Sequence, residues 1–156
     1  MRPDVLTQQG PRRIWPPMVF SPHEPAAHER TGVPQRILLV EDDFIVADEL
    51  DFWLRQAGFE VIGPAATADD AVRLALETKP ELVIMDVRLA GQKDGIEAAI
   101  QIYRQCGIRS VFATAHSDVR TRERGKAANP LAWMPKPYSP AGLIETIKAL
   151  LAAPPD

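Results

Sequence analysis

The sequence predicts an α/β domain built on a doubly wound, five-stranded parallel sheet, and three observations support this. Five short apolar runs bounded by turn residues have the pattern of strands buried on both faces. Five segments with apolar residues at helical spacing alternate with them. A helix between consecutive strands is what right-handed βαβ crossovers require. The expected strands span 36–40, 59–63, 81–86, 109–114 and 131–134, and the expected helices span 44–58, 67–80, 94–107, 117–129 and 139–153.

The first strand and helix carry clear local signals. The strand run RILLV is followed by a segment in which Ala47, Leu50 and Leu54 recur on one helical face. Gly58 provides a C-terminal stop, and the run FEVIG then predicts the second strand.

The central elements follow the same pattern. In the second helix, Thr67 and Asp70 have capping-box-like spacing, and Pro80 lies just beyond the end. The run ELVIMD predicts the third strand, and Gly107 ends the third helix.

The last elements begin with RSVFAT, the fourth strand. We expect Ser117 to be the N-cap of the fourth helix, and the run LAWM to be the fifth strand. The final helix has Ser139 as N-cap and Pro140 at its first position.

Composition and charge are ordinary for a soluble globular domain. Hydrophobic residues make up 46% of the 156 residues, and the net charge of -3 favours neither nucleic acid nor membrane. The single cysteine, Cys106, excludes an internal disulfide, and the three histidines are too scattered for a zinc site. No membrane-spanning run or secretory signal is visible, so we expect a cytoplasmic protein.

The N-terminal stretch differs from the rest of the chain. Seven of the 15 prolines lie in the first 34 residues, which show no strand or helix periodicity. We expect residues 1–34 to be a disordered tail and residues 35–153 to form the domain. Two alternative interpretations of this stretch are a short docking motif around Trp15 and a true start of the protein at Met18.

Residues that can do chemistry follow the predicted strands. In an open parallel sheet, the site lies beyond the carboxyl ends of the strands. Glu41 and Asp42 follow the first strand, Asp86 ends the third, Thr114 ends the fourth, and Lys136 follows the fifth. We therefore expect three acids, one hydroxyl and one lysine to meet at one edge of the sheet.

Such an acidic cluster needs a positive charge. Two carboxylates about 5 Å apart repel by roughly 3 kcal/mol at an effective dielectric of about 20. An all-oxygen site open to water suits Mg2+, which would let a phosphoryl group approach. Asp86, alone at the end of the central strand, could then act as nucleophile and form an aspartyl phosphate. Glu41 and Asp42 would hold the metal, and Lys136 and Thr114 would contact phosphoryl oxygens.

The motifs LLVEDD, IMDVRL followed by DG, FAT, and MPKP, in this order and at these intervals, resemble the receiver domain of two-component response regulators. Each motif alone is weak, but together they cover about residues 35–153 in register with the predicted strands. The resemblance is to the stand-alone, single-domain type. It implies a flavodoxin-like (βα)5 fold with strand order 2-1-3-4-5.

The resemblance also implies roles for individual residues. Asp86 matches the phosphoacceptor, and Thr114 and Lys136 match the hydroxyl and lysine that assist it. Glu41 and Asp42 match the acidic pair that binds Mg2+ together with Asp86.

Three further positions follow from the resemblance. The backbone carbonyl of Arg88 matches the last protein ligand of the metal. Trp133, with Thr114, matches the conformational switch, where Tyr or Phe is usual. The Lys136–Pro137 bond matches one that the family usually holds in cis.

Some positions depart from the family pattern. Ala115 replaces a glycine that is usual in the subgroup with Phe-Ala-Thr at this strand. Arg88 and His116 would flank the phosphoryl group and alter its lifetime. Trp133 is bulkier than Tyr, so its inward rotation on phosphorylation would be restricted.

We expect a phosphoacceptor and not an enzyme that turns over a substrate. A histidine kinase or histidine phosphotransfer protein would supply the phosphoryl group, and an unknown protein target would receive the signal. A homodimer could form through the face made by the fourth helix, fifth strand and fifth helix. No DNA-binding output domain, nucleic-acid partner or membrane partner is expected.

Other interpretations are open. A phosphohydrolase would need an acid where Arg88 stands, and a flavin-phosphate binder would be repelled by the acids after the first strand. A phosphorylation-silent interaction module is the main alternative. The basic run RTRERGK (120–126) predicts a solvated, marginal helix. A second hypothesis makes it an output surface for an acidic partner, with Arg120 and Arg124 as the residues to test.

Overall fold

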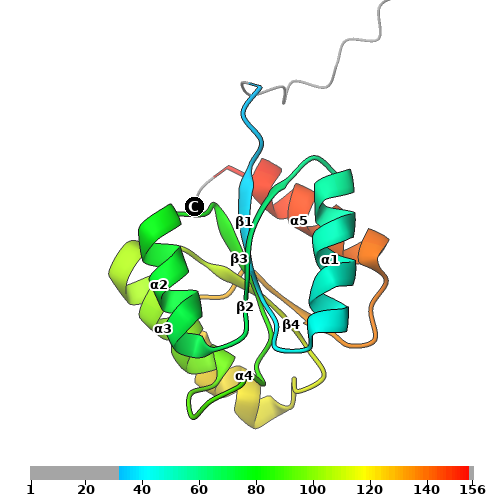
Figure 1. Ribbon diagram of the computed structural model, residues 1–156. Coiled ribbons are helices and arrows are strands. Elements are labelled where there is room, and N and C mark those ends of the chain that lie inside the picture. The colour runs from blue at the N-terminus through cyan, green and yellow to red at the C-terminus, as the bar shows by residue number, and fades with distance from the viewer. Residues whose placement is uncertain (1–31, 155–156) are drawn as a thin grey trace, which may run out of the picture. The chain divides into compact units, whose positions relative to one another are not determined.

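The computed structural model describes residues 32–154, and these form one five-stranded sheet with helices on both faces (Figure 1). The strand order is β2-β1-β3-β4-β5, and all paired strands are parallel. The predicted fold class and strand order are confirmed. The strands are β1 (Arg36–Val40), β2 (Glu60–Ala65), β3 (Leu82–Met85), β4 (Ser110–Thr114) and β5 (Ala132–Pro135). The helices are α1 (Phe44–Gln56), α2 (Ala68–Thr78), α3 (Gly95–Cys106), α4 (Val119–Gly125), the short 3-10 helix η1 (Lys126–Ala128) and α5 (Pro140–Ala152).

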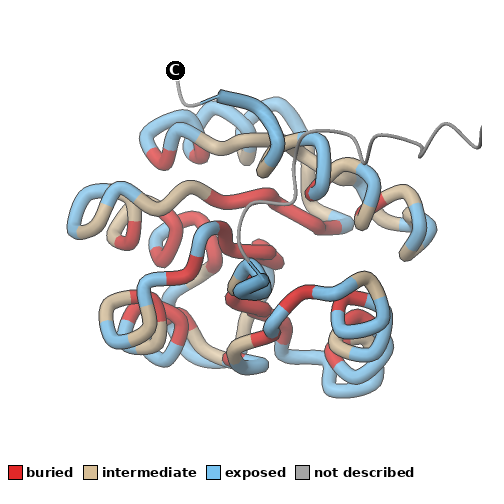
Figure 2. Tube along the Cα trace, turned by 90° about the horizontal axis from the view of Figure 1, so that it is seen from above, coloured by how far each residue is buried: buried red, intermediate tan, exposed pale blue. Residues whose placement is uncertain are grey.

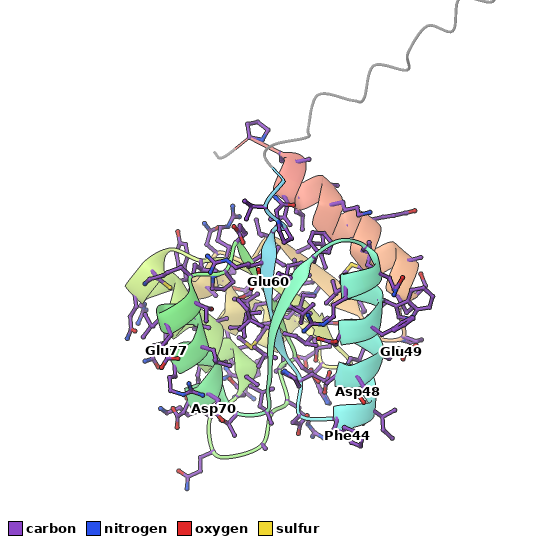
Figure 3. All side chains as sticks on the ribbon, turned by 45° about the horizontal axis from the view of Figure 1, so that its top comes forward. Phe44, Asp48, Glu49, Glu60, Asp70 and Glu77 are labelled. Carbon is purple, nitrogen blue, oxygen red and sulfur yellow. The ribbon has the colours of Figure 1, made fainter. Side chains whose placement is uncertain are left out.

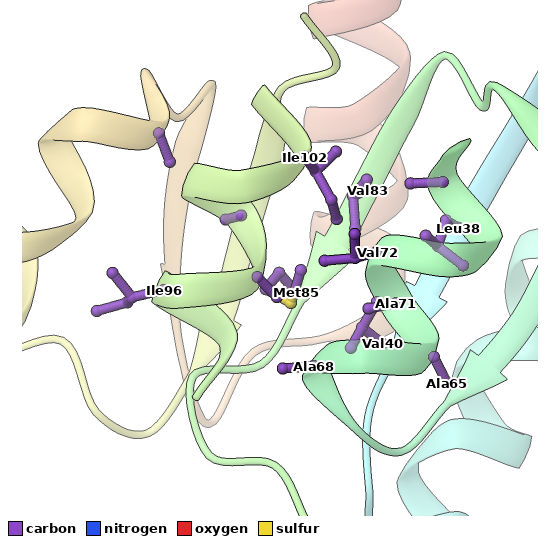
Figure 4. Packing of buried hydrophobic residues seen from close by; sticks show 14 of the residues in the cluster. Leu38, Val40, Ala65, Ala68, Ala71, Val72, Val83, Met85, Ile96 and Ile102 are labelled. Atoms are coloured by element: carbon purple, nitrogen blue, oxygen red, sulfur yellow. The ribbon is translucent and has the colours of Figure 1, made fainter. Parts of the chain in front are cut away.

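The sheet divides the core into two layers, because alternate residues of a strand point to opposite faces. On β1, Ile37 and Leu39 pack with α1 and α5, whereas Leu38 and Val40 pack with α2 and α3. Figure 2 shows the resulting buried central layer between exposed helical surfaces. The α2–α3 side contains many alanines and β-branched residues, with Met85 between the helices and the sheet (Figure 4).

Side-chain caps begin the helices close to where the sequence predicts. Thr67 accepts the amide of Asp70, and Ser139 accepts the amide of Gly142. The Thr67 hydroxyl also donates to the Asp70 carboxylate, so this pair is not the reciprocal capping box. That motif occurs at α3 instead, between Asp94 and Glu97.

The fourth helix differs from its prediction. Asp118, not Ser117, is the N-cap, because its carboxylate accepts the amide of Thr121. Serine and aspartate cap equally well, and no apolar period is present here to choose between them. The predicted single helix over 117–129 is also wrong, because α4 ends at Gly125 and the chain tightens into η1.

Two further points concern the whole chain. The predicted tail over residues 1–34 lies almost entirely outside the described residues, so it stays a prediction. Within residues 32–154, every helix is too short or too polar to cross a bilayer.

Candidate functional site

The carboxyl ends of the strands bring the predicted residues to one edge of the sheet. Glu41 and Asp86 follow the neighbouring strands β1 and β3, and the amide of Asp86 donates to the carbonyl of Val40 at 3.0 Å. Thr114 ends β4, and its carbonyl accepts the amide of Lys136 at 2.9 Å. The sheet hydrogen bonds therefore fix the spacing of these groups.

Three carboxylates form a cluster at this edge. Glu41, Asp42 and Asp86 each offer an oxygen, and these oxygens lie within 4.8 Å of one another. Glu41 is 4% exposed and Asp86 is 8% exposed, whereas Asp42 faces solvent. Burial strengthens the repulsion between two of the acids, and the exposed third acid leaves the cluster open to water.

Asp43 has a different role from its acidic neighbours. Its carboxylate accepts the amides of Ile45 at 3.0 Å and Val46 at 3.3 Å and so caps α1. The amide of Asp43 in turn donates to Glu41 at 3.1 Å. The cap thus holds the start of α1 next to the acidic cluster.

Lys136 neutralises part of the cluster. Its ammonium donates to Glu41 Oε2 at 2.9 Å and to Asp86 Oδ2 at 3.2 Å. Burial alone would lower the pKa of Lys136, but the hydrogen bond to Glu41 and the charges of Asp86 and Glu41 outweigh it and raise the pKa. Lys136 therefore stays charged, and its single positive charge faces three carboxyl groups.

The site disfavours the ionised form of Glu41. Burial raises its pKa, and the charge of Asp86 adds to this effect. Lys136 and the amide of Asp43 oppose the shift but do not cancel it. A cation at this edge would offset the repulsion between Glu41 and Asp86 and favour the ionised form of Glu41. Carboxylate oxygens open to water fit a divalent cation such as Mg2+.

The other predicted positions at this edge are Thr114, Arg88 and the Lys136–Pro137 bond. The Thr114 side chain is fully buried, and its Oγ1 accepts the amide of His116 at 3.1 Å. Arg88 is exposed two residues after Asp86, and the use of its carbonyl as a metal ligand stays a prediction. The predicted cis bond between Lys136 and Pro137 is confirmed.

Trp133 lies under α4. Its ring stacks on Phe112, with centroids 4.3 Å apart and planes at 21°. The guanidinium of Arg122 lies 5.4 Å from the centroid of the Trp133 ring. Trp133, the predicted switch residue, therefore packs against Phe112 of β4 and is contacted by Arg122 of α4.

Two residues of this region were missed by sequence reasoning. Asp43 was given no role from the sequence, although an acid just before a helix is a common N-cap. Asp94 was noted only as part of a motif, although Asp94 and Glu97 have the spacing of a capping box. Both signals were present in the sequence.

Comparisons with known proteins agree with this geometry. The family model of the response regulator receiver domain matches residues 37–148. The chain is 37% identical over 124 residues to the transcriptional regulatory protein PdtaR of Mycobacterium tuberculosis, which covers 80% of this chain and 60% of that protein. It is 32% identical over 117 residues to the phyllosphere-induced regulator PhyR of Methylorubrum extorquens, with coverage of 74% and 43%. The chain thus spans between 43% and 60% of the length of these curated relatives.

A solved structure gives the same result. The two-component response regulator of the LuxR family from Aurantimonas sp. SI85-9A1 superposes with a TM-score of 0.69 at 34% identity, covering 77% of this chain and 86% of that chain. The family model, the curated relatives and the solved structure all point to the same family. The chain therefore belongs to the family of response regulator receiver domains.

Proposed function

We propose that this receiver domain accepts a phosphoryl group on Asp86, with Mg2+ held by Glu41, Asp42 and Asp86. A histidine kinase or a histidine phosphotransfer protein supplies the group from a phosphohistidine. The observation that carries the proposal is the position of Lys136, whose ammonium contacts both Glu41 and Asp86. A carboxylate nucleophile beside a cationic side chain that can pair with phosphoryl oxygens is suited to forming an aspartyl phosphate.

Each residue of the site has its own role in phosphoryl transfer to Asp86. The Asp86 carboxylate is the nucleophile, and its Oδ2 already accepts a hydrogen bond from Lys136. The ammonium of Lys136 can move from this oxygen to a phosphoryl oxygen, because both carry negative charge. Thr114 can reach a second phosphoryl oxygen only if its hydroxyl turns away from the His116 amide. Bound Mg2+ would neutralise the remaining charge during transfer.

The same geometry argues against turnover of a substrate. An aspartate-based phosphohydrolase needs a general acid close to the nucleophile, and the exposed residue two positions on is Arg88. We therefore assign the chain a phosphoacceptor role that ends in protein–protein signalling. Dimerisation through α4, β5 and α5 is part of the proposal, and the position of β5 at the edge of the sheet supports it.

Intact mass after incubation with acetyl phosphate and Mg2+ tests the phosphoacceptor. We expect one added phosphoryl group on the wild type and none on Asp86→Asn. Wild type that stays unmodified with every phosphodonor would leave a phosphorylation-silent interaction module as the function.

Adjacent acids provide a matched test of the metal site. Asp42→Asn removes a member of the carboxylate cluster, whereas Asp43→Asn changes an acid that caps α1, and asparagine caps equally well. Calorimetric titration with Mg2+ should show binding about tenfold or more weaker for Asp42→Asn, and near-normal binding for Asp43→Asn. Equal losses in the two variants would mean that general charge, and not the cluster, attracts the ion.

A further inference from the structure

The helix α4 is attached to the domain differently from the other long helices. All seven of its residues are described, and only Gly125 among them is buried. Its first residue, Val119, is 79% exposed. An amphipathic stripe therefore cannot hold α4 in place, and its position depends on a few side-chain contacts.

The first contact joins α4 to Trp133. A Cβ at Gly125 would lie 2.6 Å from Trp133 Cζ2, so the backbone of α4 rests directly against the edge of the indole. Phe112 stacks on the ring, and Arg122 of α4 lies within cation–π distance of it. The Trp133 ring has no room to turn unless α4 moves with it.

The second contact joins α4 to the start of α3. Arg124 Nη2 donates to Asp94 Oδ2 at 2.7 Å, and Asp94 Oδ1 accepts the amide of Glu97 at 3.0 Å. Asp94 thus uses one oxygen to cap α3 and the other to bind α4. These residues lie 30 positions apart in the chain, so the ion pair is a tertiary contact.

The segment that carries Asp94 is pressed against the proposed phosphoacceptor. The amide of Gly95 donates to the carbonyl of Val87 at 2.7 Å. Any Cβ at position 95 would overlap the carbonyl oxygen of Asp86, so the two backbones are in contact. A change at Asp86 therefore reaches Asp94 through one or two residues of backbone.

We propose that the ion pair between Arg124 and Asp94 is a latch that holds α4 in the unphosphorylated domain, and that phosphorylation of Asp86 opens it. The inference rests on the proposed function. An added phosphoryl group shifts the Val87–Gly95 contact and moves the Asp94 carboxylate away from Arg124. Partly exposed ion pairs contribute little free energy, and the hydrogen bond within the pair is lost once donor and acceptor are more than about 3.5 Å apart, so a small shift is enough. With the latch open, α4 and Trp133 move as one unit.

The latch also explains why the basic run 120–126, which covers most of α4 and the first residue of η1, is not a ready-made binding surface. Arg122 is engaged by the Trp133 ring, Arg124 by Asp94, and Lys126 by Glu123. Within residues 32–154, Arg120 forms no side-chain hydrogen bond or ion pair. Opening the latch frees the guanidinium of Arg124 for an acidic partner only after phosphorylation.

Hydrogen–deuterium exchange of the α4 amides in the full chain tests the latch without a phosphodonor. Arg124→Gln removes one partner, and Asp94→Asn removes the other charge but keeps an N-cap for α3. Arg120→Gln is the control on the same helix. We expect α4 to exchange at least about threefold faster in Arg124→Gln and in Asp94→Asn, with no change in Arg120→Gln. The double variant should exchange no faster than either single variant, because both remove the same contact. Rates equal to those of Arg120→Gln would overturn the latch.

The second arm adds acetyl phosphate and Mg2+ in excess, with intact mass measured on the same sample. Phosphorylated wild type should exchange in α4 as fast as unmodified Arg124→Gln, and the variant itself should change little further. An adduct on the wild type with unchanged α4 exchange overturns the opening of the latch and leaves the proposed function standing. Absence of any adduct, together with fast exchange in Arg124→Gln, instead overturns the proposed function and the phosphorylation-driven release.

Discussion

The helices α1 and α4 both follow strands that end at the site, but different interactions hold them. α1 has thirteen residues and buries Ala47, Leu50 and Leu54 against the sheet. α4 has seven residues, buries only Gly125 and depends on two arginines. A buried apolar stripe fixes a helix firmly, whereas charged contacts near the surface hold it weakly. The acids are therefore next to a firmly packed helix, whereas α4 is held by weaker contacts.

The outer surfaces of the two helices also differ. α1 exposes Phe44, Ile45, Phe52 and Trp53 beside acidic residues, and Figure 3 shows Phe44, Asp48 and Glu49 along its outer side. α4 exposes basic residues. Apolar side chains next to acids on one helix and arginines on the other suit different partners.

The largest effect is expected from a substitution in the buried apolar stripe of α1. Leu54 is fully buried, so Leu54→Ala should lower the free energy of unfolding by about 3 kcal/mol. The control is Val119→Ala in α4, where the side chain is 79% exposed and little change is expected. Urea unfolding measures both, with the slope checked for constancy. Similar losses in the two variants would contradict the difference between the helices.

A smaller effect is expected where α4 meets Trp133. Gly125→Ala gains helix propensity of about 1 kcal/mol but drives a methyl group into the indole, at a cost of roughly 1–3 kcal/mol. We expect net destabilisation in the wild type. In a Trp133→Leu background the space is larger, and the same change should become stabilising. A change of sign in a double-mutant cycle of unfolding free energies is the measurement, and equal values in both backgrounds would refute the contact.

The same contrast explains what the sequence could and could not predict. β1 and α1 carry their signals locally, in an apolar run and a helical period, so their positions were predicted to within two residues. The contact between Lys136 and Glu41 spans 95 residues but was predicted, because parallel strands place their carboxyl ends together. Nothing local marks the contacts of α4. Arg124 reaches Asp94 across 30 residues and could equally have faced solvent. A helix was predicted here, but the contacts that hold α4 are visible only in three dimensions.

Removing the cap of α1 should have an intermediate effect. Asp43→Ala leaves the amides of Ile45 and Val46 without their acceptor and should cost about 1 kcal/mol. Asp43→Asn should be nearly neutral. Asp118→Ala is the equivalent change in α4, and it should speed local amide exchange there with less effect on global unfolding. If Asp118→Ala costs as much in global stability as Asp43→Ala, α4 is part of the cooperative core, and the comparison fails.

At neutral pH the smallest expected effect concerns Tyr138, which packs against the α1 side of the core and whose ionisation affects stability only in alkaline solution. Burial raises the pKa of Tyr138 to about 12, the charges of Glu41 and Asp86 add to the shift, and Lys136 opposes it. Because the folded pKa lies above the ordinary value of about 10, the neutral phenol contributes stability below pH ~10 that is lost as the pH rises through about 12.

Absorbance titration of tyrosinate can resolve this step, since the chain has only two tyrosines. The late transition should disappear in Tyr138→Phe and persist in Tyr103→Phe. Unfolding free energy should also fall less between pH ~10 and ~12 in Tyr138→Phe than in wild type. A wild type without this late transition would mean that water reaches the Tyr138 phenol. The α1 side would then be less tightly packed than its buried leucines indicate.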